Sequence, residues 1–403
     1  MTLTSLAPEA THEFAASIVG PEHANVVGPC CSAAPADAQQ AAEVLRFADE
    51  HGLAVGVEGA GSKLGWTNAG RTDLRVLTHR MSMMREHTWQ DMTCTVQAGC
   101  TWQAMQTALA EHGQHVALDP LLPEKATVGG VVAANDSGAL RLRYGGLRDL
   151  VIGMTLVLAD GTIARSGGKV VKNVAGYDLP KLLCGSFGTL ALITEVTFRL
   201  HSIARQTASL TVTAATAEPL GKLLLLLLDS QFSIQSMQLR TDTAGFALDI
   251  RVAARPEVLS NQQDGVASVA ESMGLVAQAS SVQVWAAREQ LFAPSAFVFK
   301  ATMLPTEIAA AAQAIQELGG KAVVQAVGIL TGSLPSFSFP HRLADLRARL
   351  EAAGGSLTVL QAPSETDFDR WGTLPGSLPL MRAVKQQFDP HGILNPGRFL
   401  GKI

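Results

Sequence analysis

The stretch of sequence that decides the fold runs from residue 123 to residue 138 and reads PEKATVGGVVAANDSG. From Gly129 onward it is rich in glycine, alanine and small polar residues. Glycine lets a backbone come close to a ligand, because it has no side chain in the way. The composition predicts an irregular segment over residues 126–138 with a slot in which a flat, extended ligand lies against main chain.

Another glycine-rich loop lies upstream, directly after an apolar run over residues 53–57 that predicts a buried strand. It spans residues 59–65 and reads GAGSKLG. Backbone N–H groups that converge on one point bind phosphate well. By itself, however, this pattern predicts a plain tight turn as readily as a phosphate site.

Two familiar nucleotide-binding loops are excluded at this position. A Rossmann dinucleotide-binding unit needs its glycines to open a helix, but the WTNAG that follows Gly65 is not amphipathic. A Walker loop needs glycine, lysine and then serine or threonine, whereas this loop reads Ser62-Lys63-Leu64.

A third glycine pair stands in the sequence GSFGTL, residues 185–190, and leads into the longest predicted strand, residues 188–200. Before it, residues 151–158 and 162–166 flank the turn Asp160-Gly161 and predict a β-hairpin. The N-terminal half therefore combines a β-rich scaffold with three small-residue loops.

Composition limits the classes of function. The 403 residues favour two domains over one, and a net charge of -4 gives no reason to expect nucleic acid or an acidic membrane as a partner.

The chain starts without the features of a signal peptide, and its most apolar run, Leu223–Leu228, is far shorter than the roughly 20 residues that span a bilayer. The five cysteines form no C-x-x-C pattern, which favours reduced thiols in the cytoplasm and excludes an iron–sulfur cluster held by this chain alone.

The composition of the sequence changes after His201, where glycines become scarce, so we place a domain boundary near residue 204. The apolar run at residues 223–228 predicts a helix that is buried on most sides, and its alternative is a subunit interface. In this half, hydrophobic periodicity predicts strands over 208–216, 233–239 and 246–253, and helices over 306–318 and 342–353.

The three loops, in this order and spacing, resemble the FAD-binding domain of the vanillyl-alcohol oxidase family, also called the PCMH type. The similarity spans about residues 20–204 and returns in a closing signature, FDPHGILNPG, at residues 388–397. Within the family, the run GGKVVKNVAGYD at residues 167–178 most resembles the FAD-binding subunits of bacterial glycolate oxidase (glycolate dehydrogenase). The matching elements are GAGSKLG, PEKATVGG with AANDSG, RYGGLRD, LADGT and GSFGTLALITEVTFRL.

The resemblance implies an α+β fold with three parts. Residues 20–204 form a PCMH-type FAD-binding domain, residues 205–380 form a ferredoxin-like α+β cap domain, and residues 381–403 pack back on the FAD domain. The residues expected to bind FAD are Gly59, Gly61, Ser62, Lys63, Leu64, Thr127, Val128, Gly129, Gly130, Ala133, Asn135, Ser137, Gly138, Tyr144, Gly185, Ser186, Gly188, Ile193 and Asn395.

Two departures from the family affect the chemistry. Members that attach FAD covalently use a histidine or cysteine, and Ser62 stands at the corresponding position, so we expect noncovalent FAD. Metal-dependent 2-hydroxy-acid dehydrogenases of the family carry G-H-x-G-D-G-N-x-H and E-H-G motifs in the cap. Both motifs are absent and His341 stands alone, so we expect no metal site, and the sequence assigns no catalytic residue.

Several polar residues allow two interpretations each. Lys125 and Arg143 are either contacts for a substrate carboxylate or the FAD diphosphate, or solvated surface charges. His391 is either a base near the flavin or an exposed turn residue, and Tyr144 either stacks on a ring or belongs to the core. The loop at residues 169–173 either borders the flavin and faces another subunit, or merely connects a hairpin to a helix.

The resemblance implies an FAD-binding subunit of a 2-hydroxy-acid oxidase complex. A catalytic FAD subunit would oxidise glycolate or another small 2-hydroxy acid, and an iron–sulfur subunit would carry the electrons onward. Two alternatives stay open: a self-sufficient FAD-dependent D-2-hydroxy-acid oxidase or dehydrogenase, and a non-catalytic assembly subunit stabilised by FAD. The expected location is cytoplasmic, or peripheral at the inner membrane through partner subunits.

Overall fold

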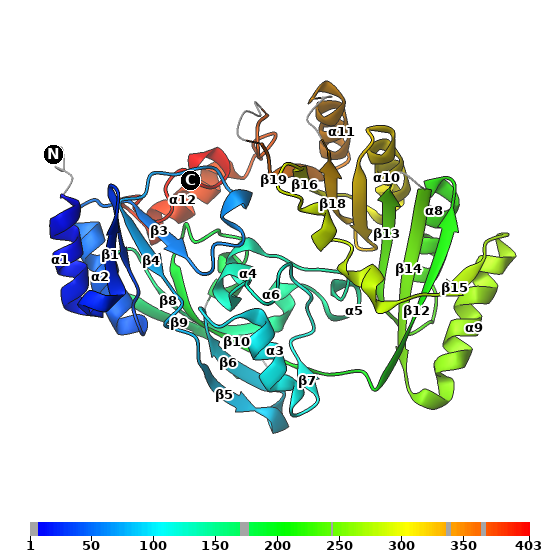
Figure 1. The fold of residues 1–403 in the computed structure, drawn as a ribbon, viewed down its shortest axis with the longest axis horizontal. Coiled ribbons are helices and arrows are strands. Elements are labelled where there is room, and N and C mark those ends of the chain that lie inside the picture. The colour runs from blue at the N-terminus through cyan, green and yellow to red at the C-terminus, as the bar shows by residue number, and fades with distance from the viewer. Residues whose placement is uncertain (1–6, 170–176, 243–244, 336–339, 364–367) are drawn as a thin grey trace. The chain divides into compact units, whose positions relative to one another are not determined.

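We describe the protein from a computed structural model, which covers residues 7–169, 177–242, 245–335, 340–363 and 368–403 (Figure 1). The described residues form two compact units. Unit 1 takes them from Met1–Asp136, Gly146–Ile203 and Leu374–Ile403, and unit 2 from Ser137–Gly145 and Ala204–Thr373. The chain therefore leaves unit 1 briefly after Asp136, returns at Gly146, and leaves again for a long excursion that ends at Thr373.

The first sheet of unit 1 contains the strand that leads into the first glycine-rich loop. Its order is β1-β2-β4-β3, with an antiparallel β1–β2 hairpin and parallel pairing of β4 with both β2 and β3. Helices α1 and α2 cover it and bury a shared apolar cluster around Leu45, Val55 and Leu74. The bounds are α1 Pro8–Val19, β1 Ala24–Val27, β2 Cys30–Ala33, α2 Ala38–Glu50, β3 Val55–Glu58 and β4 Leu74–Leu77.

The second sheet of unit 1 is antiparallel, in the order β5-β6-β10-β8-β9. The β8–β9 hairpin with its Asp160-Gly161 turn confirms the sequence prediction. Trp102 of α3 contacts Phe198 of β10 edge to face, with ring centroids 5.8 Å apart, in the apolar core beneath this sheet. The bounds are β5 Met84–Thr88, β6 Thr93–Gln97, α3 Trp102–Ala110, α6 Leu147–Leu150, β8 Val151–Val157, β9 Ile163–Gly167, α7 Leu179–Leu183 and β10 Leu192–Arg199.

The segment predicted to be irregular contains a short helix, α4 (Val128–Ala134), and the prediction was wrong on this point. Thr127 begins the helix by accepting a hydrogen bond from the Gly130 N–H, at 3.3 Å. Asn135 ends it in the left-handed conformation, with a φ of 48°. Two neighbouring carbonyls accept the remaining N–H groups of the first turn, because Val128 donates to Cys100 and Gly129 donates to Ala98. Tertiary hydrogen bonds thus stabilise a helix that two adjacent glycines disfavour.

The C-terminal segment belongs to unit 1. Helix α12 (Leu378–Phe388) precedes an extended stretch in which Leu394 forms a parallel bridge with Val55 of β3. The Val55 N–H donates to the Ile393 carbonyl and the Asn395 N–H donates to the Val55 carbonyl, both at 2.8 Å. The end of the chain thereby becomes an extra edge beside the strand that carries the first glycine-rich loop.

Unit 2 contains two copies of one topology joined edge to edge. The copies run β12-α8-β13-β14-α9-β15 and β16-α10-β17-β18-α11-β19. Each has the strand order of a ferredoxin-like βαββαβ unit, and pairing of β13 with β17 joins them into one eight-stranded sheet. The predicted ferredoxin-like cap is confirmed, and it is doubled.

The elements of unit 2 share one apolar core between the helices and one face of the sheet. Leu223, Leu224 and Leu227 of α8 are buried in it, as the sequence predicted, while Leu226 is 53% exposed. No helix in the described ranges is long and apolar enough to cross a membrane. The bounds are β12 Gln206–Ala214, α8 Ala217–Leu228, β13 Ile234–Asp242, β14 Gly245–Ala254, α9 Pro256–Ser272, β15 Ala277–Ala279, β16 Phe297–Thr302, α10 Ile308–Glu317, β17 Lys321–Gln325, β18 Ile329–Leu334, α11 Pro340–Ala352 and β19 Ser356–Gln361.

Two histidines face each other just before the chain leaves unit 1. His115 of β7 (Gln114–His115) pairs with His201 of β11 (His201–Ser202) in a short antiparallel ladder. Burial, and secondarily the charge of His201, lowers the pKa of His115 to about 4. Burial also lowers the pKa of His201, with a smaller effect from Arg199.

We therefore expect the free energy of unfolding to fall as the pH drops from about 6.5 to about 4. In that window the unfolded chain binds a proton at His115 that the folded chain rejects, and the difference favours unfolding. Chemical denaturation at a series of pH values should show this slope, and His115→Gln should flatten it. His341→Gln, at an exposed histidine of α11, is the control variant. An unaltered slope in His115→Gln would contradict the assignment.

Candidate cofactor-binding site

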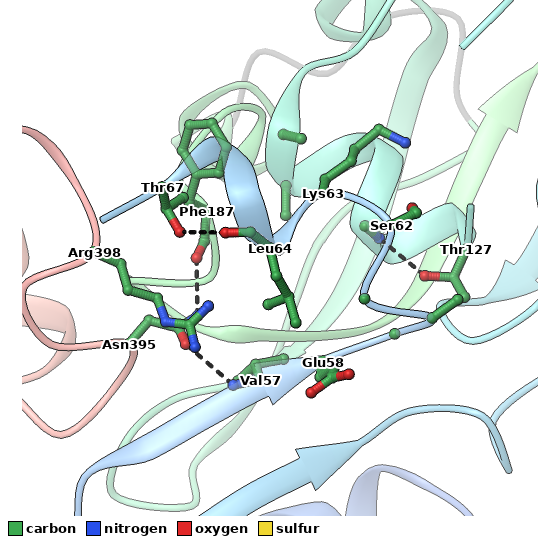
Figure 2. Close-up of a pocket in the computed structure, with 16 residues that line it drawn as sticks. Val57, Glu58, Ser62, Lys63, Leu64, Thr67, Thr127, Phe187, Asn395 and Arg398 are labelled. Atoms are coloured by element: carbon green, nitrogen blue, oxygen red, sulfur yellow. Dashed lines mark hydrogen bonds between the residues drawn. The ribbon is translucent and has the colours of Figure 1, made fainter. Parts of the chain in front are cut away.

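A groove in unit 1 is lined by all three glycine-rich loops and by the C-terminal segment (Figure 2). It consists of two adjoining pockets, which share the lining residues Val57, Gly59, Gly130, Ala133, Phe187 and Asn395. The first pocket is also lined by Glu58, Ala60, Gly61, Ser62, Lys63, Leu64, Thr67, Thr127, Ala134 and Arg398. The second is also lined by Thr78, Ala98, Gly129, Gly188, Ala191 and Ile193.

The first loop follows β3 and lies against the start of α4. A Cβ atom on Gly59 would lie 2.1 Å from the Thr127 hydroxyl, so no side chain fits there. Gly61 adopts a φ of 71°, which favours glycine. The close approach of the two loops therefore explains why glycine stands at these two positions.

Lys63 connects the first loop to the segment that follows α4. Its ammonium group lies 3.6 Å from the Asp136 carboxylate, and both side chains are buried. Lys63 also donates to the Leu121 carbonyl at 3.3 Å, while Asp136 accepts from the Leu121 N–H at 2.7 Å. The ammonium group of Lys63 is thus neutralised inside the protein.

The third loop is tied to α4 through its backbone. The Gly185 N–H donates to the Val132 carbonyl at 3.1 Å, and the Phe187 N–H donates to the Ala133 carbonyl at 2.9 Å. Phe187 lines both pockets and adopts a φ of 51°. These bonds hold the second and third loops together as one wall of the groove.

Asn395 connects the C-terminal segment to two of these walls. Its Oδ1 atom accepts from the Val57 N–H at 3.2 Å, and its Nδ2 atom donates to the Phe187 carbonyl at 2.9 Å. A Cβ atom on Gly188 would lie 2.6 Å from Nδ2. The carboxamide of Asn395 therefore spans the groove's base between β3 and the third loop.

The structure brings together most of the residues that the sequence predicted for the site. Gly59, Gly61, Ser62, Lys63, Leu64, Thr127, Gly129, Gly130, Ala133, Gly188, Ile193 and Asn395 all line the groove. Their contact with FAD itself stays a prediction.

The remaining predicted residues are not among those that line the two pockets, and their contact with FAD also stays a prediction. Val128 is fully buried in the core, and Asn135 forms the end of α4. Gly185 and Ser186 line a separate apolar pocket beside α7 and α12. Ser137, Gly138 and Tyr144 belong to unit 2, where the Tyr144 hydroxyl accepts from Gln235.

Several lining residues escaped the sequence reasoning, among them Glu58, Phe187 and Arg398. Glu58 ends the strand before the first loop, and Arg398 directly follows the Asn395-Pro396-Gly397 motif, so adjacency to a recognised motif was the available signal. The others are Val57, Ala60, Thr67, Thr78, Ala98, Ala134 and Ala191.

Two of the ambiguous polar residues now have partners in unit 1. His391 is 64% exposed and its ring pairs with the Asp49 carboxylate at 2.9 Å, which fits the exposed turn residue. Lys169 forms an ion pair with Glu86. Lys172 and Asn173 lie outside the described residues.

Comparison with known proteins indicates which cofactor the N-terminal domain binds. Residues 29–167 match the family described as FAD binding domain, and residues 373–399 match the C-terminal domain of FAD linked oxidases. The chain therefore contains an FAD binding domain and, near its C-terminus, a segment of the FAD linked oxidases.

The similarity extends over most of the chain for two glycolate oxidase subunits and over less than half of it for a D-lactate dehydrogenase. Glycolate oxidase subunit GlcE of Escherichia coli is 29% identical over 86% of this chain and 93% of its own length. Glycolate oxidase subunit GlcD of Bacillus subtilis is 28% identical over 92% of this chain and 88% of its own. D-lactate dehydrogenase of Archaeoglobus fulgidus is 35% identical, but over only 46% of this chain and 41% of its own.

Solved structures support the PCMH-type fold. p-Cresol methylhydroxylase with substrate bound superposes with a TM-score of 0.72, covering 97% of this chain and 96% of that one at 15% identity. Alkyldihydroxyacetonephosphate synthase gives a TM-score of 0.68 and covers 91% of this chain and 76% of that one, at 16% identity.

The residues of the groove suit FAD, which carries two flat ring systems joined through a diphosphate. A Cβ atom on Gly130 would meet only the Thr127 hydroxyl, at 3.2 Å, so this face of α4 is open to the groove. The Nε atom of Arg398 is buried without a hydrogen-bond partner in the structure. An open glycine face and an unsatisfied cationic donor are what a flat, anionic ligand requires.

Two adjacent glycines of α4 allow a matched test of the groove. We expect Gly130→Leu to weaken FAD binding at least tenfold while the protein stays folded, because the leucine side chain would enter the groove. Gly129→Ala should instead cost stability, roughly 1–3 kcal/mol, since its Cβ would lie 2.8 Å from that of Ala98. The flavin-to-protein absorbance ratio and thermal unfolding of the apo-protein distinguish the two. FAD-loaded Gly130→Leu would contradict the placement of α4.

Replacing Asn395 with aspartate should weaken both the fold and FAD binding. Aspartate tolerates the φ of 44° at this position, but its carboxylate cannot donate to the Phe187 carbonyl. Loss of that bond should lower the free energy of unfolding by about 1–3 kcal/mol. Chemical denaturation and FAD titration measure the two effects, with Asn25→Asp on the exposed edge strand as control. A variant as stable as the native protein would show that the carboxamide bridge is dispensable.

Proposed function

We propose that this chain is the FAD-binding subunit of a multi-subunit glycolate or related 2-hydroxy-acid oxidase, in which electrons leave the substrate through flavin. The observation that carries the proposal is the similarity to GlcE of Escherichia coli, which extends over 86% of this chain and 93% of that protein. Both GlcE and GlcD are named as subunits of glycolate oxidase, and the chain is similar to each over most of its length.

In this proposal the groove of unit 1 holds FAD noncovalently. Ser62 stands in the first loop where covalent attachment would need a histidine or cysteine, and neither residue type is among the described residues that line the groove. Bound FAD supplies the acceptor for the hydride of a 2-hydroxy acid. The chain's own part is to hold the cofactor: the three loops enclose it, and the Asn395 carboxamide fixes their spacing.

Three arginines of unit 2 already have partners inside that unit, which fits substrate oxidation by another subunit. Arg240 forms a two-pronged ion pair with the fully buried Asp249, with bonds of 2.5 and 2.9 Å. Arg251 stacks on Trp285 at 4.4 Å, and Arg288 donates to the Ser137 carbonyl at 2.5 Å. Each of these guanidinium groups is therefore engaged within unit 2.

In this proposal, partner subunits carry out substrate oxidation and onward electron transfer. A catalytic FAD subunit would oxidise the 2-hydroxy acid, and an iron–sulfur subunit would carry the electrons, since this sequence has no cysteine cluster. We place the complex in the cytoplasm or, through partner subunits, at the inner membrane. A self-sufficient D-2-hydroxy-acid dehydrogenase and a non-catalytic assembly subunit are the competing assignments.

Flavin reduction distinguishes these assignments. We expect the isolated, FAD-loaded chain to stay oxidised with glycolate or D-lactate under anaerobic conditions, and the complex purified from native cells to be reduced by glycolate. Absorbance near the flavin maximum and turnover with an artificial acceptor report both. Turnover by the isolated chain would favour the self-sufficient enzyme. A complex in which only the partner's flavin is reduced, while this chain's FAD stays oxidised, would favour the assembly subunit.

A further inference from the structure

Arg398 presents a guanidinium group to the first pocket of the groove, beside the first glycine-rich loop (Figure 2). Its backbone is fixed at both ends: its N–H donates to the Asn395 carbonyl at 3.3 Å, and its carbonyl accepts from the Asn68 N–H at 3.1 Å. Its Cγ atom lies 3.1 Å from the position that a Cβ atom would take on Gly70. The start of the side chain is thus held in place, and the guanidinium group is directed by the fold.

This guanidinium group is half-buried, and one of its donors has no acceptor within the protein. The Nε atom is inaccessible to solvent and has no hydrogen-bond partner. Burial lowers the pKa of Arg398, an effect that the charge of Glu58 opposes. Because a buried donor without an acceptor is costly, an acceptor supplied by a bound ligand would lower that cost.

The other charged residues of this pocket are already compensated within the protein. Glu58 accepts two hydrogen bonds from Arg75, at 2.5 and 3.1 Å, and this pairing raises the pKa of Arg75. Lys63 pairs with the buried Asp136. Among the described residues that line the first pocket, Arg398 is therefore the charged group with no ion pair of its own.

The second pocket has a different character. Ala98, Ala191 and Ile193 contribute to its lining, and none of the described residues that line it carries a charge. A flat, uncharged ring suits that pocket, whereas an anion suits the first pocket, where the backbone of Gly59–Leu64 faces Arg398. In FAD the only groups that are anionic in every redox state are the two phosphates.

We propose that Arg398 binds the diphosphate of FAD and is the residue whose positive charge compensates it. The planar guanidinium group offers parallel N–H donors that match phosphate oxygens, and the first loop supplies backbone donors to the same group. The proposal rests on FAD binding and is independent of which substrate the complex oxidises.

The test compares two ligands that share the diphosphate but differ in the flavin. Apo-protein of the native chain, Arg398→Gln, Arg398→Lys and Arg382→Gln is titrated with FAD and with ADP by calorimetry. We expect Arg398→Gln to weaken both ligands by a similar factor, roughly 10- to 100-fold, and to reduce the salt dependence of binding. Arg398→Lys should lose less, since it keeps the charge. Arg382→Gln, at an exposed residue of α12 whose side chain donates to the Gly401 carbonyl, should match the native protein.

Two results would overturn the proposal. FAD and ADP affinities within twofold of native in Arg398→Gln would show that the side chain contacts no phosphate. Weaker FAD with unchanged ADP, together with a shifted flavin reduction potential, would place Arg398 against the flavin ring instead. Thermal unfolding of each apo-variant separates weakened binding from a damaged fold, and Arg398→Lys provides the comparison if Arg398→Gln is unstable.

Discussion

The pairing of residues 393–395 with Val55 is the constraint on which the cofactor groove depends. It brings the end of the chain beside β3, and from there Asn395 reaches Val57 and Phe187, which lie 338 and 208 positions away in sequence. Without this return the first and third loops would have no common support on that side of the groove. The loops supply the shape of the site, but the C-terminal segment sets their spacing.

A buried ion pair holds this segment in place. Asp389 accepts from Lys385 at 2.5 Å and from the N–H groups of Ile393 and Leu394 at 2.9 and 2.8 Å. Lys385 in turn donates to the carbonyls of Thr189 and Leu394. A buried pair is tolerated when further hydrogen bonds satisfy both groups, as they do here. The closing signature FDPHGILNPG thus contains its own scaffold, because its aspartate shapes the turn that presents its asparagine.

Much of the groove could be predicted from signals within a few residues of each position, whereas contacts between residues far apart in the sequence could not. The glycines of the first and second loops, the hairpin at Asp160-Gly161 and the main strands carry their signals within a few residues. Helix α4 does not, because carbonyls of Cys100 and Ala98 stabilise it against its own glycines. The role of Lys63 was equally hidden, since a lysine in a phosphate-binding pattern reveals nothing of the aspartate, far along the chain, that neutralises it.

The doubled cap escaped sequence analysis for a related reason. The two βαββαβ copies share strand order and alternation but no motif, and their alignment is set by pairing across the sheet, for example of Leu239 with Val324. Close packing of α8 on α10 adds to it, since a Cβ atom on Gly221 would lie 2.6 Å from that of Ala309. Because the two copies are held together by backbone pairing and helix contact, they do not need a repeated sequence motif. Inspection of the sequence therefore does not reveal the repeat.

Neighbours in sequence can also serve different units, and this limits what a motif predicts. Asp136 is bound within unit 1 by Lys63 and Leu121. The carbonyl of the next residue, Ser137, accepts within unit 2 from Arg288 and from Gln325 at 2.9 Å. The residues of the motif AANDSG are consecutive in the sequence, but Asp136 has its partners in unit 1 and Ser137 has its partners in unit 2. A motif read as one unit therefore does not reveal which of its residues are held together in the fold, and the contact of each with FAD stays a prediction.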